Sequence, residues 1–343
     1  MPTVAITGVS GRVGQRLLRA LADRDVAAQV VGLDLQQPSY RPRSLTFHAV
    51  DLGSADLKPL LEGVDVVVHL ASLFAPVPDE EVMARVNIEG TRRLLDAAAA
   101  TGVGKVVVVS SAAVYGAWPN NPTPITEDVA VRPNAGFDFA VHKAEIERML
   151  VEWRDEHPGV VTTVLRPPLV LGGGTPDSVA AVVRGRFPVR VRDAAPDVQY
   201  VHIDDLVSAL VLAVESDLPG AYNVAPDGWL SDEDARALAG RVPRPPVPAD
   251  VADRILRRLW AGGVSDIPPG MVPFFVHPCV VANDRLRAAG WQPRHTTDDA
   301  ILACVEEAGE PVAGRSPKVT LAVAGGLAVA AAGIAWGALR RRR

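Results

Sequence analysis

A strand-like run that leads straight into three spaced glycines constrains this chain more than any other feature. Residues 4–7 are mostly apolar, and Gly8, Gly11 and Gly14 follow them at intervals of three positions. Glycines in such a turn allow a tight bend, let backbone N–H groups approach a phosphate, and bring the start of a helix close to a sheet. The pattern therefore predicts a strand, an anion-binding turn and a helix in succession.

Valine-rich runs alternate with amphipathic stretches through the first two-thirds of the chain. Unbroken apolar runs suit strands that are buried on both faces, and their alternation with helices is typical of a parallel sheet covered on both sides. We therefore predict the α/β class, with a doubly wound parallel sheet of the Rossmann type and a smaller C-terminal substrate lobe. The strands are expected at 4–7, 30–34, 46–50, 64–70, 106–110 and 161–166, and the main helices at 12–22, 80–101 and 135–156.

The C-terminal segment differs in composition from the rest of the chain. Residues 319–339 carry no charge and precede four arginines at 340–343. At about 1.5 Å per residue this segment is long enough to cross a bilayer core. A C-terminal transmembrane helix is therefore expected, with a soluble alanine-rich helix as the alternative. The expected domains are 1–170 for the Rossmann domain, 171–310 for the substrate lobe (some of its elements return to the sheet), 311–318 for a linker, 319–339 for the membrane helix and 340–343 for a basic tail.

Charge, cysteines and the first residues limit the partners and the location. The net charge of −5 argues against a nucleic-acid partner. Cys279 and Cys304 lie far apart and the histidines are scattered, so no metal site is expected. The first strand begins without a charged and apolar leader, so we expect no signal peptide. Together with the helix at 319–339, this predicts the cytoplasmic face of a membrane, with a soluble cytoplasmic location as the fallback.

A carboxylate at the end of the second predicted strand extends the glycine pattern. Asp34 follows Gly14 by 20 residues, where its side chain can accept hydrogen bonds from the ribose hydroxyls of an adenosine. The same charge would repel a 2′-phosphate, so NAD is favoured over NADP as the cofactor. The alternative is a tight turn followed by a surface aspartate.

Further motifs follow in a fixed order along about residues 3–300. They are Asp51-Leu52, His69-Leu70-Ala71-Ser72, Asn87-Ile88-Glu89-Gly90-Thr91, Ser110-Ser111 with Tyr115-Gly116, Lys143, Leu165-Arg166-Pro167 and His202-Ile203-Asp204-Asp205. With the GxxGxxG spacing of the glycines, this series resembles the extended short-chain dehydrogenase/reductase family of the NAD-dependent epimerase/dehydratase type. The resemblance implies that NAD is bound by Gly8, Gly11, Arg12, Val13, Gly14, Asp34, Asp51, Leu52, Leu70, Ala71, Asn87 and Lys143.

The resemblance also implies where the reaction would occur. Ser111 occupies the position that binds the substrate hydroxyl, and Lys143 occupies that of the lysine that holds the nicotinamide ribose. Four residues before this lysine the family has a catalytic tyrosine, but this chain has Phe139. A phenyl ring cannot transfer a proton, and loss of a positioned acid or base typically costs about 10²–10⁴ in rate. His142 lies three positions on, near the same helical face, and is a candidate substitute, with a structural role as the alternative.

The substrate is less constrained by sequence than the cofactor. Val198 occupies the place where nucleotide-sugar members of the family commonly have a diphosphate-binding arginine. Arg190 and Arg192 share one face of a predicted strand and could compensate, or they could form a solvated face.

Two functions therefore stay open. The first is an NAD-binding, epimerase/dehydratase-like oxidoreductase that uses Ser111 and Lys143 without the tyrosine. Its small-molecule substrate would be a sugar nucleotide or another hydroxyl-bearing compound, lipid- or steroid-like ones included. The second is a catalytically silent NAD-binding sensor or scaffold, associated with a membrane through 319–339. A homodimer is compatible with both.

Overall fold

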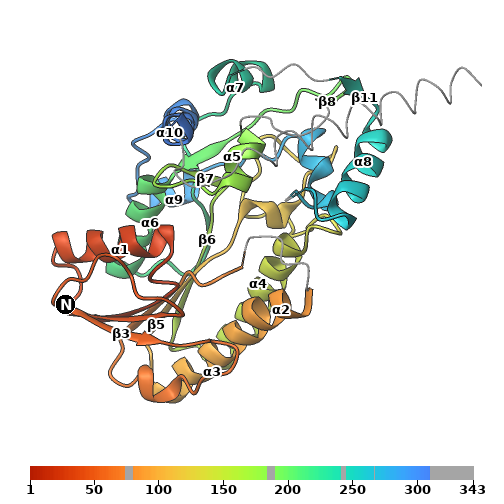
Figure 1. The fold of residues 1–343 in the computed structure, drawn as a ribbon. Coiled ribbons are helices and arrows are strands. Elements are labelled where there is room, and N and C mark those ends of the chain that lie inside the picture. The colour runs from red at the N-terminus through yellow and green to blue at the C-terminus, as the bar shows by residue number, and fades with distance from the viewer. Residues whose placement is uncertain (74–79, 184–189, 241–244, 266, 310–343) are drawn as a thin grey trace, which may run out of the picture. The chain divides into compact units, whose positions relative to one another are not determined.

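The computed structural model describes the chain except for residues 74–79, 184–189, 241–244, 266 and 310–343 (Figure 1). The chain divides into two compact units, Met1–Glu307 and Ala308–Arg343. The first unit holds all the elements described below, apart from the last two residues of its final helix.

A seven-stranded parallel sheet forms the centre of the first unit (Figure 1). The strand order is β10-β6-β5-β4-β1-β2-β3, and every neighbouring pair is parallel. The order reverses between β1 and β4, so this sheet has the switch point at which doubly wound proteins bind ligands. The strands are β1 (Thr3–Thr7), β2 (Gln29–Asp34), β3 (Leu45–Ala49), β4 (Val66–His69), β5 (Lys105–Val109), β6 (Val161–Arg166) and β10 (Gly220–Asn223).

Helices cover both faces of this sheet, as predicted. Figure 1 shows α1 (Arg12–Asp23) and α6 (Ile203–Glu215) on one side, and α3 (Gly90–Thr101) and α4 (Asp138–Glu156) on the other. Neighbouring residues of a strand point to opposite faces, so one core contains Val4 and Ile6 of β1, whereas the other contains Ala5. The predicted doubly wound α/β sheet is confirmed.

The helix predicted at 80–101 forms with an internal irregularity. It consists of α2 (Glu80–Ala84), a π-helical turn η2 (Arg85–Glu89) and α3. The helix predicted from residue 135 begins only at Asp138, because Gly136 has a φ of +78° and Phe137 is not helical.

Most of the remaining elements form a smaller lobe at the carboxyl ends of the strands or connect it to the sheet, whereas the 3-10 turn at Lys58–Leu60 lies between β3 and β4 and contacts α3. α6 packs against α1 and β10 pairs with β6 of the sheet, and the predicted domain organisation remains a prediction. The elements are η1 (Lys58–Leu60), η3 (Ala112–Tyr115), β7 (Leu169–Leu171), α5 (Asp177–Val183), β8 (Arg190–Val191), β9 (Tyr200–His202), α7 (Asp232–Leu238), β11 (Pro246–Val247), α8 (Ala249–Ala261), η4 (Pro269–Phe275), α9 (Asp284–Ala288) and α10 (Thr297–Gly309).

The fold prediction was wrong in including a transmembrane helix. Within the residues that the structure describes, no helix is both long and apolar enough to cross a membrane. α4, which has 19 residues, carries charged side chains along its length. The predicted helix at 319–339, the linker at 311–318 and the basic tail at 340–343 all lie outside the described residues. Over the described residues, the fold class is therefore α/β with a doubly wound sheet.

A buried ion pair ties three strands to a covering helix. Arg166, at the end of β6, donates from Nε to both carboxylate oxygens of Glu147 on α4, at 3.0 and 3.1 Å. Ser110 after β5 donates to the same carboxylate at 2.5 Å, and Arg166 Nη1 donates to the hydroxyl of Tyr115 at 2.7 Å. Tyr115 in turn donates to Asn223 Oδ1 of β10 at 2.9 Å. The network thus fixes β5, β6, β10 and α4 against one another.

Removing one member of this pair should destabilise the protein strongly. Glu147→Gln leaves the guanidinium of Arg166 buried without its counter-charge, a loss of about 3–5 kcal/mol in the free energy of unfolding. Urea denaturation measures this loss. The double variant Glu147→Met/Arg166→Met should recover much of it, because neither charge then remains. Asp250→Asn, which breaks the exposed Asp250–Arg254 pair on α8, should leave the unfolding midpoint almost unchanged. An equal loss of stability in Glu147→Gln and Asp250→Asn would contradict this role of the buried pair.

Candidate functional site

The glycine turn between β1 and α1 is closely packed against its surroundings. Gly8 has a φ of +70°, and a Cβ on it would lie 2.8 Å from the backbone nitrogen of Ala71. A Cβ on Gly14 would lie 2.2 Å from the carbonyl oxygen of Gly8, and one on Gly11 would lie 3.1 Å from the same atom. Larger residues would therefore fill or distort this turn. The turn fits the backbone cradle that a pyrophosphate requires.

Asp34 lies at the edge of this turn. Its carboxylate accepts hydrogen bonds from the backbone nitrogens of Ser10, at 3.0 Å, and Gln36, at 3.3 Å. The carboxylate is therefore held beside the glycine turn at the end of β2, as the sequence predicted. Asp51 and Leu52 follow β3, where Asp51 accepts from the backbone nitrogen of Gly53 at 2.9 Å and Leu52 is buried.

The side chain of Arg12, a residue predicted to bind the cofactor, is bound to the backbone that follows β6. Its guanidinium donates to the backbone oxygens of Gly172, at 2.6 Å, and Val170, at 2.9 Å. Burial lowers the pKa of this group. The side chain therefore joins α1 to the segment that follows β6. At the start of α1, Arg12 and Val13 present backbone N–H groups that have no acceptor within the helix.

A buried histidine organises the loop that follows β4. Thr7 Oγ1 lies 2.7 Å from His69 Nδ1 and accepts from the backbone nitrogens of Leu70 and Ala71, both at 3.2 Å. The opposite ring nitrogen, Nε2, lies 2.8 Å from Thr91 Oγ1. Since Thr7 already accepts two N–H groups, its own proton points at Nδ1, and Nε2 of a neutral ring carries the proton. Burial, and secondarily the charge of Lys143, lowers the pKa of His69 to about 3.

Asn87 continues this network toward the predicted cofactor edge. It is buried, and its amide accepts from the backbone nitrogen of Leu73 at 2.8 Å and donates to the carbonyl of the same residue at 3.2 Å. Asn87 therefore braces the loop that carries Leu70 and Ala71.

Ser111 and the side chain of Lys143 both lie at the carboxyl end of β5. Ser111 has an extended backbone, and its hydroxyl oxygen accepts from the backbone nitrogen of Ala113 at 3.1 Å. Lys143, on α4, donates from Nζ to the backbone oxygen of Val109 at 2.8 Å. Its ammonium lies 5.6 Å from the ring centre of Phe139. Burial lowers the pKa of Lys143 to about 8, against the opposing effect of Glu147.

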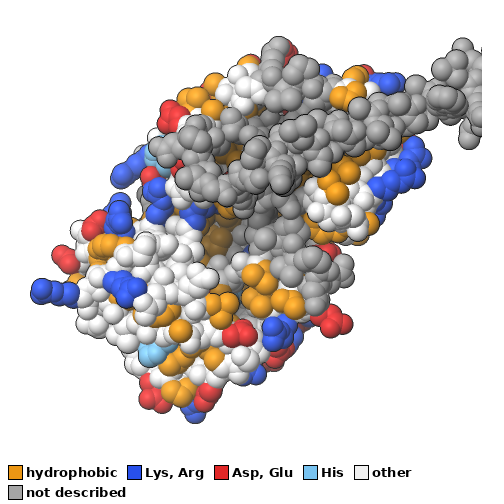
Figure 2. Space-filling model, viewed as in Figure 1, with side chains coloured by type: hydrophobic (Ala, Val, Ile, Leu, Met, Phe, Trp, Pro, Cys, Tyr) orange, Lys and Arg blue, Asp and Glu red, His pale blue; other side chains and the backbone are white. Residues whose placement is uncertain are grey.

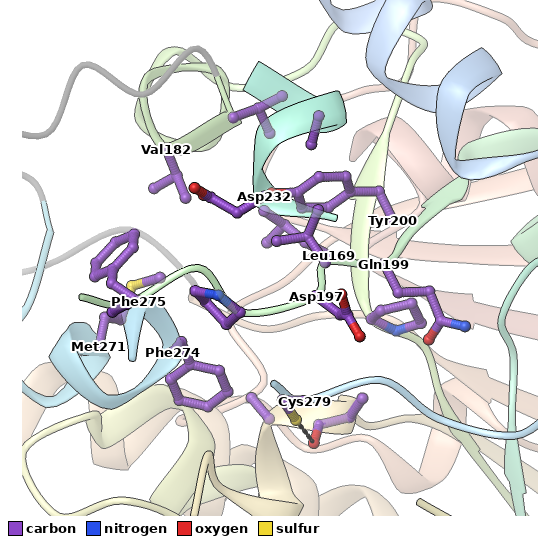
Figure 3. Close-up of a pocket in the computed structure, with 18 of the residues that line it drawn as sticks. Leu169, Val182, Asp197, Gln199, Tyr200, Asp232, Met271, Phe274, Phe275 and Cys279 are labelled. Carbon is purple, nitrogen blue, oxygen red and sulfur yellow. Dashed lines mark hydrogen bonds between the residues drawn. The ribbon is translucent and has the colours of Figure 1, made fainter. Parts of the chain in front are cut away.

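A cavity opens in front of Ser111 and Phe139, between the sheet and the smaller lobe. Figure 2 shows hydrophobic side chains at a hollow on the visible face, and Figure 3 shows the cavity lining. The lining comes mostly from the smaller lobe and is rich in apolar and aromatic side chains. It includes Phe137, Pro168, Leu169, Val182, Val183, Arg190, Val191, Asp197, Val198, Gln199, Tyr200, Asp232, Arg236, Met271, Phe274, Phe275 and Cys279.

His142, the candidate substitute for the tyrosine, and the nearby Tyr115 both lie away from the cavity. His142 is buried but is not among the described residues that line the cavity. Tyr115 is fully buried within the Arg166 network, and burial raises its pKa to about 12. Neither side chain therefore reaches the cavity beside Ser111.

Sequence reasoning missed several cavity residues. Phe274 of η4 packs edge-on against Phe137, with ring centres 5.8 Å apart, and Phe137 lies 6.0 Å from Phe139. Cys279 is half-buried, and burial raises the pKa of its thiol to about 12, so the thiol is neutral. The one sequence signal was the run of apolar residues 271–276, which marks a buried segment without saying what it lines.

His202, Asp204 and His295 are the described residues whose side chains lie close enough together to suggest a cation site. The two imidazole rings stack with centres 4.0 Å apart, so their lone pairs run side by side instead of converging on one point. Asp204 is also bound to Arg16. This arrangement does not suit a tetrahedral metal, and the prediction of no metal site remains a prediction.

Comparison with known proteins gives a consistent family. The model of the NAD dependent epimerase/dehydratase family matches residues 4–225, more than half of the chain. A 3-diazoavenalumate denitrifying reductase from a Streptomyces species is 28% identical over 317 residues, which cover 85% of this chain and 96% of the relative. Human sterol-4-alpha-carboxylate 3-dehydrogenase, decarboxylating, is 29% identical over 217 residues, which cover 61% of this chain and 58% of the relative.

Solved structures agree on the fold. The NAD complex of UDP-glucose 4-epimerase from Thermus thermophilus superimposes with a TM-score of 0.69 at 24% identity, over 90% of this chain and all of that one. UDP-glucuronic acid 4-epimerase from Bacillus cereus, also with NAD, gives a TM-score of 0.70 at 18% identity, again over 90% of this chain and all of the other.

The buried histidine should make the stability of the protein depend on pH. His69 takes up a proton near pH 6.5 when unfolded but only near pH 3 when folded. Stability is therefore fully retained above about pH 6.5 and falls by up to about 1.4 kcal/mol per pH unit below it. His69→Gln should show a shallower decline between pH 7 and pH 5 in urea denaturation. His48→Gln, on β3 outside the network, should keep the wild-type slope, and an unchanged slope in His69→Gln would contradict the assignment.

Proposed function

Because the chain belongs to the NAD dependent epimerase/dehydratase family, we propose that it oxidises or reduces a hydroxyl-bearing small molecule in the cavity beside Ser111. The observation that carries this proposal is that Ser111 lines an open cavity at the carboxyl end of β5, the strand whose Val109 carbonyl binds the ammonium of Lys143. In an open α/β sheet this edge is where ligands bind. The proposed substrate site and the proposed cofactor site thus adjoin.

The cofactor is NAD, as predicted, since the family is NAD-dependent. The residues proposed to hold it are the glycine turn with Gly8, Gly11 and Gly14, the carboxylate of Asp34, and Lys143. The close approach of Ala71 to Gly8 within the turn supports this assignment of the cofactor site. When bound, NAD supplies the group that accepts or returns hydride.

The proposed roles in the reaction rest on two side chains. Ser111 Oγ accepts from Ala113, so its proton can be donated to a substrate oxygen. The ammonium of Lys143 would donate to a ribose hydroxyl of NAD and would add positive charge to the site. Phe139 contributes a ring and no proton, so the reaction lacks the usual acid or base at this position.

A reaction that needs no proton donor is compatible with this cavity. The Streptomyces relative is named as a denitrifying reductase of a diazo compound. Hydride delivery that releases dinitrogen requires no acid at the reacting carbon. Phe139 therefore favours, for this chain, a hydride acceptor that does not have to be protonated.

A second candidate is a protein that binds NAD without turnover. Phe139 packs against Phe137, and the ammonium of Lys143 lies near its ring, so the position of the usual acid or base holds a side chain that transfers no proton. This candidate requires NAD binding and no hydride transfer.

The cofactor proposal can be tested by titration with NADH. Lys143→Met should weaken NADH binding roughly tenfold to a hundredfold, because a hydrogen bond from a charged donor contributes about 1.5–3 kcal/mol. Fluorescence titration measures the dissociation constants. Lys58→Met, on the exposed side of η1, should bind NADH like the wild type. Unchanged affinity in Lys143→Met would overturn the assigned role.

Hydride transfer can be tested through Ser111 and Phe139. With a panel of UDP-glucose, a 3-hydroxysteroid and a benzylic alcohol, Ser111→Ala should lower NADH formation by about 10²-fold or more. Phe139→Tyr should raise the rate toward a proton-requiring substrate by up to about 10²–10⁴. Turnover that survives Ser111→Ala unchanged would refute the proposed chemistry. NADH binding without turnover in the wild type and in Phe139→Tyr would establish the second candidate instead.

A further inference from the structure

One charged side chain of the cavity lining, Asp197, has no hydrogen-bond or ion-pair partner among the described residues. Asp197 is half-buried, and Figure 3 shows its carboxylate directed into the cavity. A half-buried carboxylate that faces a cavity and has no partner among the described residues is available to a hydrogen-bond donor of a ligand.

The backbone around Asp197 is firmly held. Val198 and Leu230 exchange two hydrogen bonds, at 2.8 and 3.0 Å. The amide of Gln199 donates to the carbonyls of Gly228, at 3.0 Å, and Val281, at 3.2 Å, and accepts from the Val281 nitrogen at 2.9 Å. The carboxylate therefore occupies a defined position and does not hang from a loose loop.

The other charges of the lining are paired or lie at the rim. Asp232 binds Arg236 at 2.7 Å on α7. Arg190 lies on β8 and is exposed. Cys279, which also faces the cavity (Figure 3), is a neutral thiol. Asp197 thus supplies the unbalanced charge in the inner part of the described lining.

An aromatic wall lines another part of the same cavity. Phe137, Phe139 and Phe274 form a chain of ring contacts 5.8–6.0 Å between centres, and Met271 and Phe275 extend it. Such a wall binds a flat or alicyclic ring through its apolar area. A hydrated diphosphate gains little from these side chains.

We propose that Asp197 selects the substrate, by binding a hydrogen-bond donor on a largely apolar, ring-containing molecule and by repelling diphosphates. This inference rests on the proposed function, because it names the class of compound that the cavity beside Ser111 accepts. The donor, a hydroxyl or an ammonium, gains a charge-assisted hydrogen bond in a partly desolvated site. A diphosphate would place like charge near Asp197 at reduced dielectric. The absence of an arginine at Val198 acts in the same direction.

The experiment uses one ring with three different substituents. Binding of naphthalen-2-ol, naphthalen-2-ylmethanamine, naphthalene-2-carboxylate and UDP-glucose to the NAD-saturated full chain is measured by calorimetry. The wild type should bind the hydroxyl or the ammonium probe roughly tenfold to a hundredfold more tightly than the carboxylate. UDP-glucose should bind no better than the carboxylate. The two donor probes distinguish a neutral from a cationic substrate.

Asp197→Asn and Asp197→Leu test the residue itself. Both should bring the affinities for the donor and carboxylate probes within a few-fold of each other. Asp193→Asn, an exposed neighbour that does not line the cavity, should keep the wild-type preference. NAD affinity, measured in the same samples, should not change in any variant. If the wild type does not bind NAD, the proposed function is refuted, whatever the role of Asp197.

Three results would overturn the role of Asp197. The first is tight binding of UDP-glucose to the wild type. The second is an unchanged preference for donor probes in both Asp197 variants. The third is failure of every ring probe to bind while NAD still binds.

Discussion

The buried pair of Arg166 and Glu147 is the interaction on which the arrangement of the site depends. It lies where β5, β6 and β10 end, so it determines how the carboxyl edges of these strands meet α4. Lys143 is one helical turn before Glu147 on the same helix. The position of the ammonium at Val109 is therefore a consequence of the same pair. A buried ion pair costs desolvation and is weak evidence for stability, but here it holds α4 in register with the sheet.

The other half of the sheet uses neutral groups for the same purpose. Thr7, His69, Thr91 and Asn87 connect β1, β4 and the helix that follows in one chain of hydrogen bonds. This chain holds the loop with Leu70 and Ala71 against the glycine turn. A cationic histidine would break the pattern, since it would present a proton where Thr7 already donates. The two halves are thus braced by different chemistry, and the cofactor edge lies between them.

The sequence was most informative where the pattern is local. The glycine turn, Asp34 at the end of β2 and the strands of the sheet follow from short-range spacing and apolar runs. Asp197, Phe274 and Cys279 could not be predicted as neighbours of Ser111, because they come from segments 86 to 168 residues away that meet only in the folded lobe. The direction of the Arg12 side chain was also beyond local reasoning, since its acceptors lie after β6. The predicted transmembrane helix was wrong, since no helix among the described residues is both long and apolar enough to cross a membrane.

The bond between Arg12 and the segment at Gly172 has a mechanical consequence. The first turn of α1 is part of the anion-binding turn, and its guanidinium is bound to two carbonyls of the segment that enters the smaller lobe. Moving the lobe away from the sheet would stretch both of these hydrogen bonds. A hydrogen bond from a charged donor contributes about 1.5–3 kcal/mol to stability. A displacement of the glycine turn therefore displaces the start of the smaller lobe, and a displacement of the lobe displaces the turn.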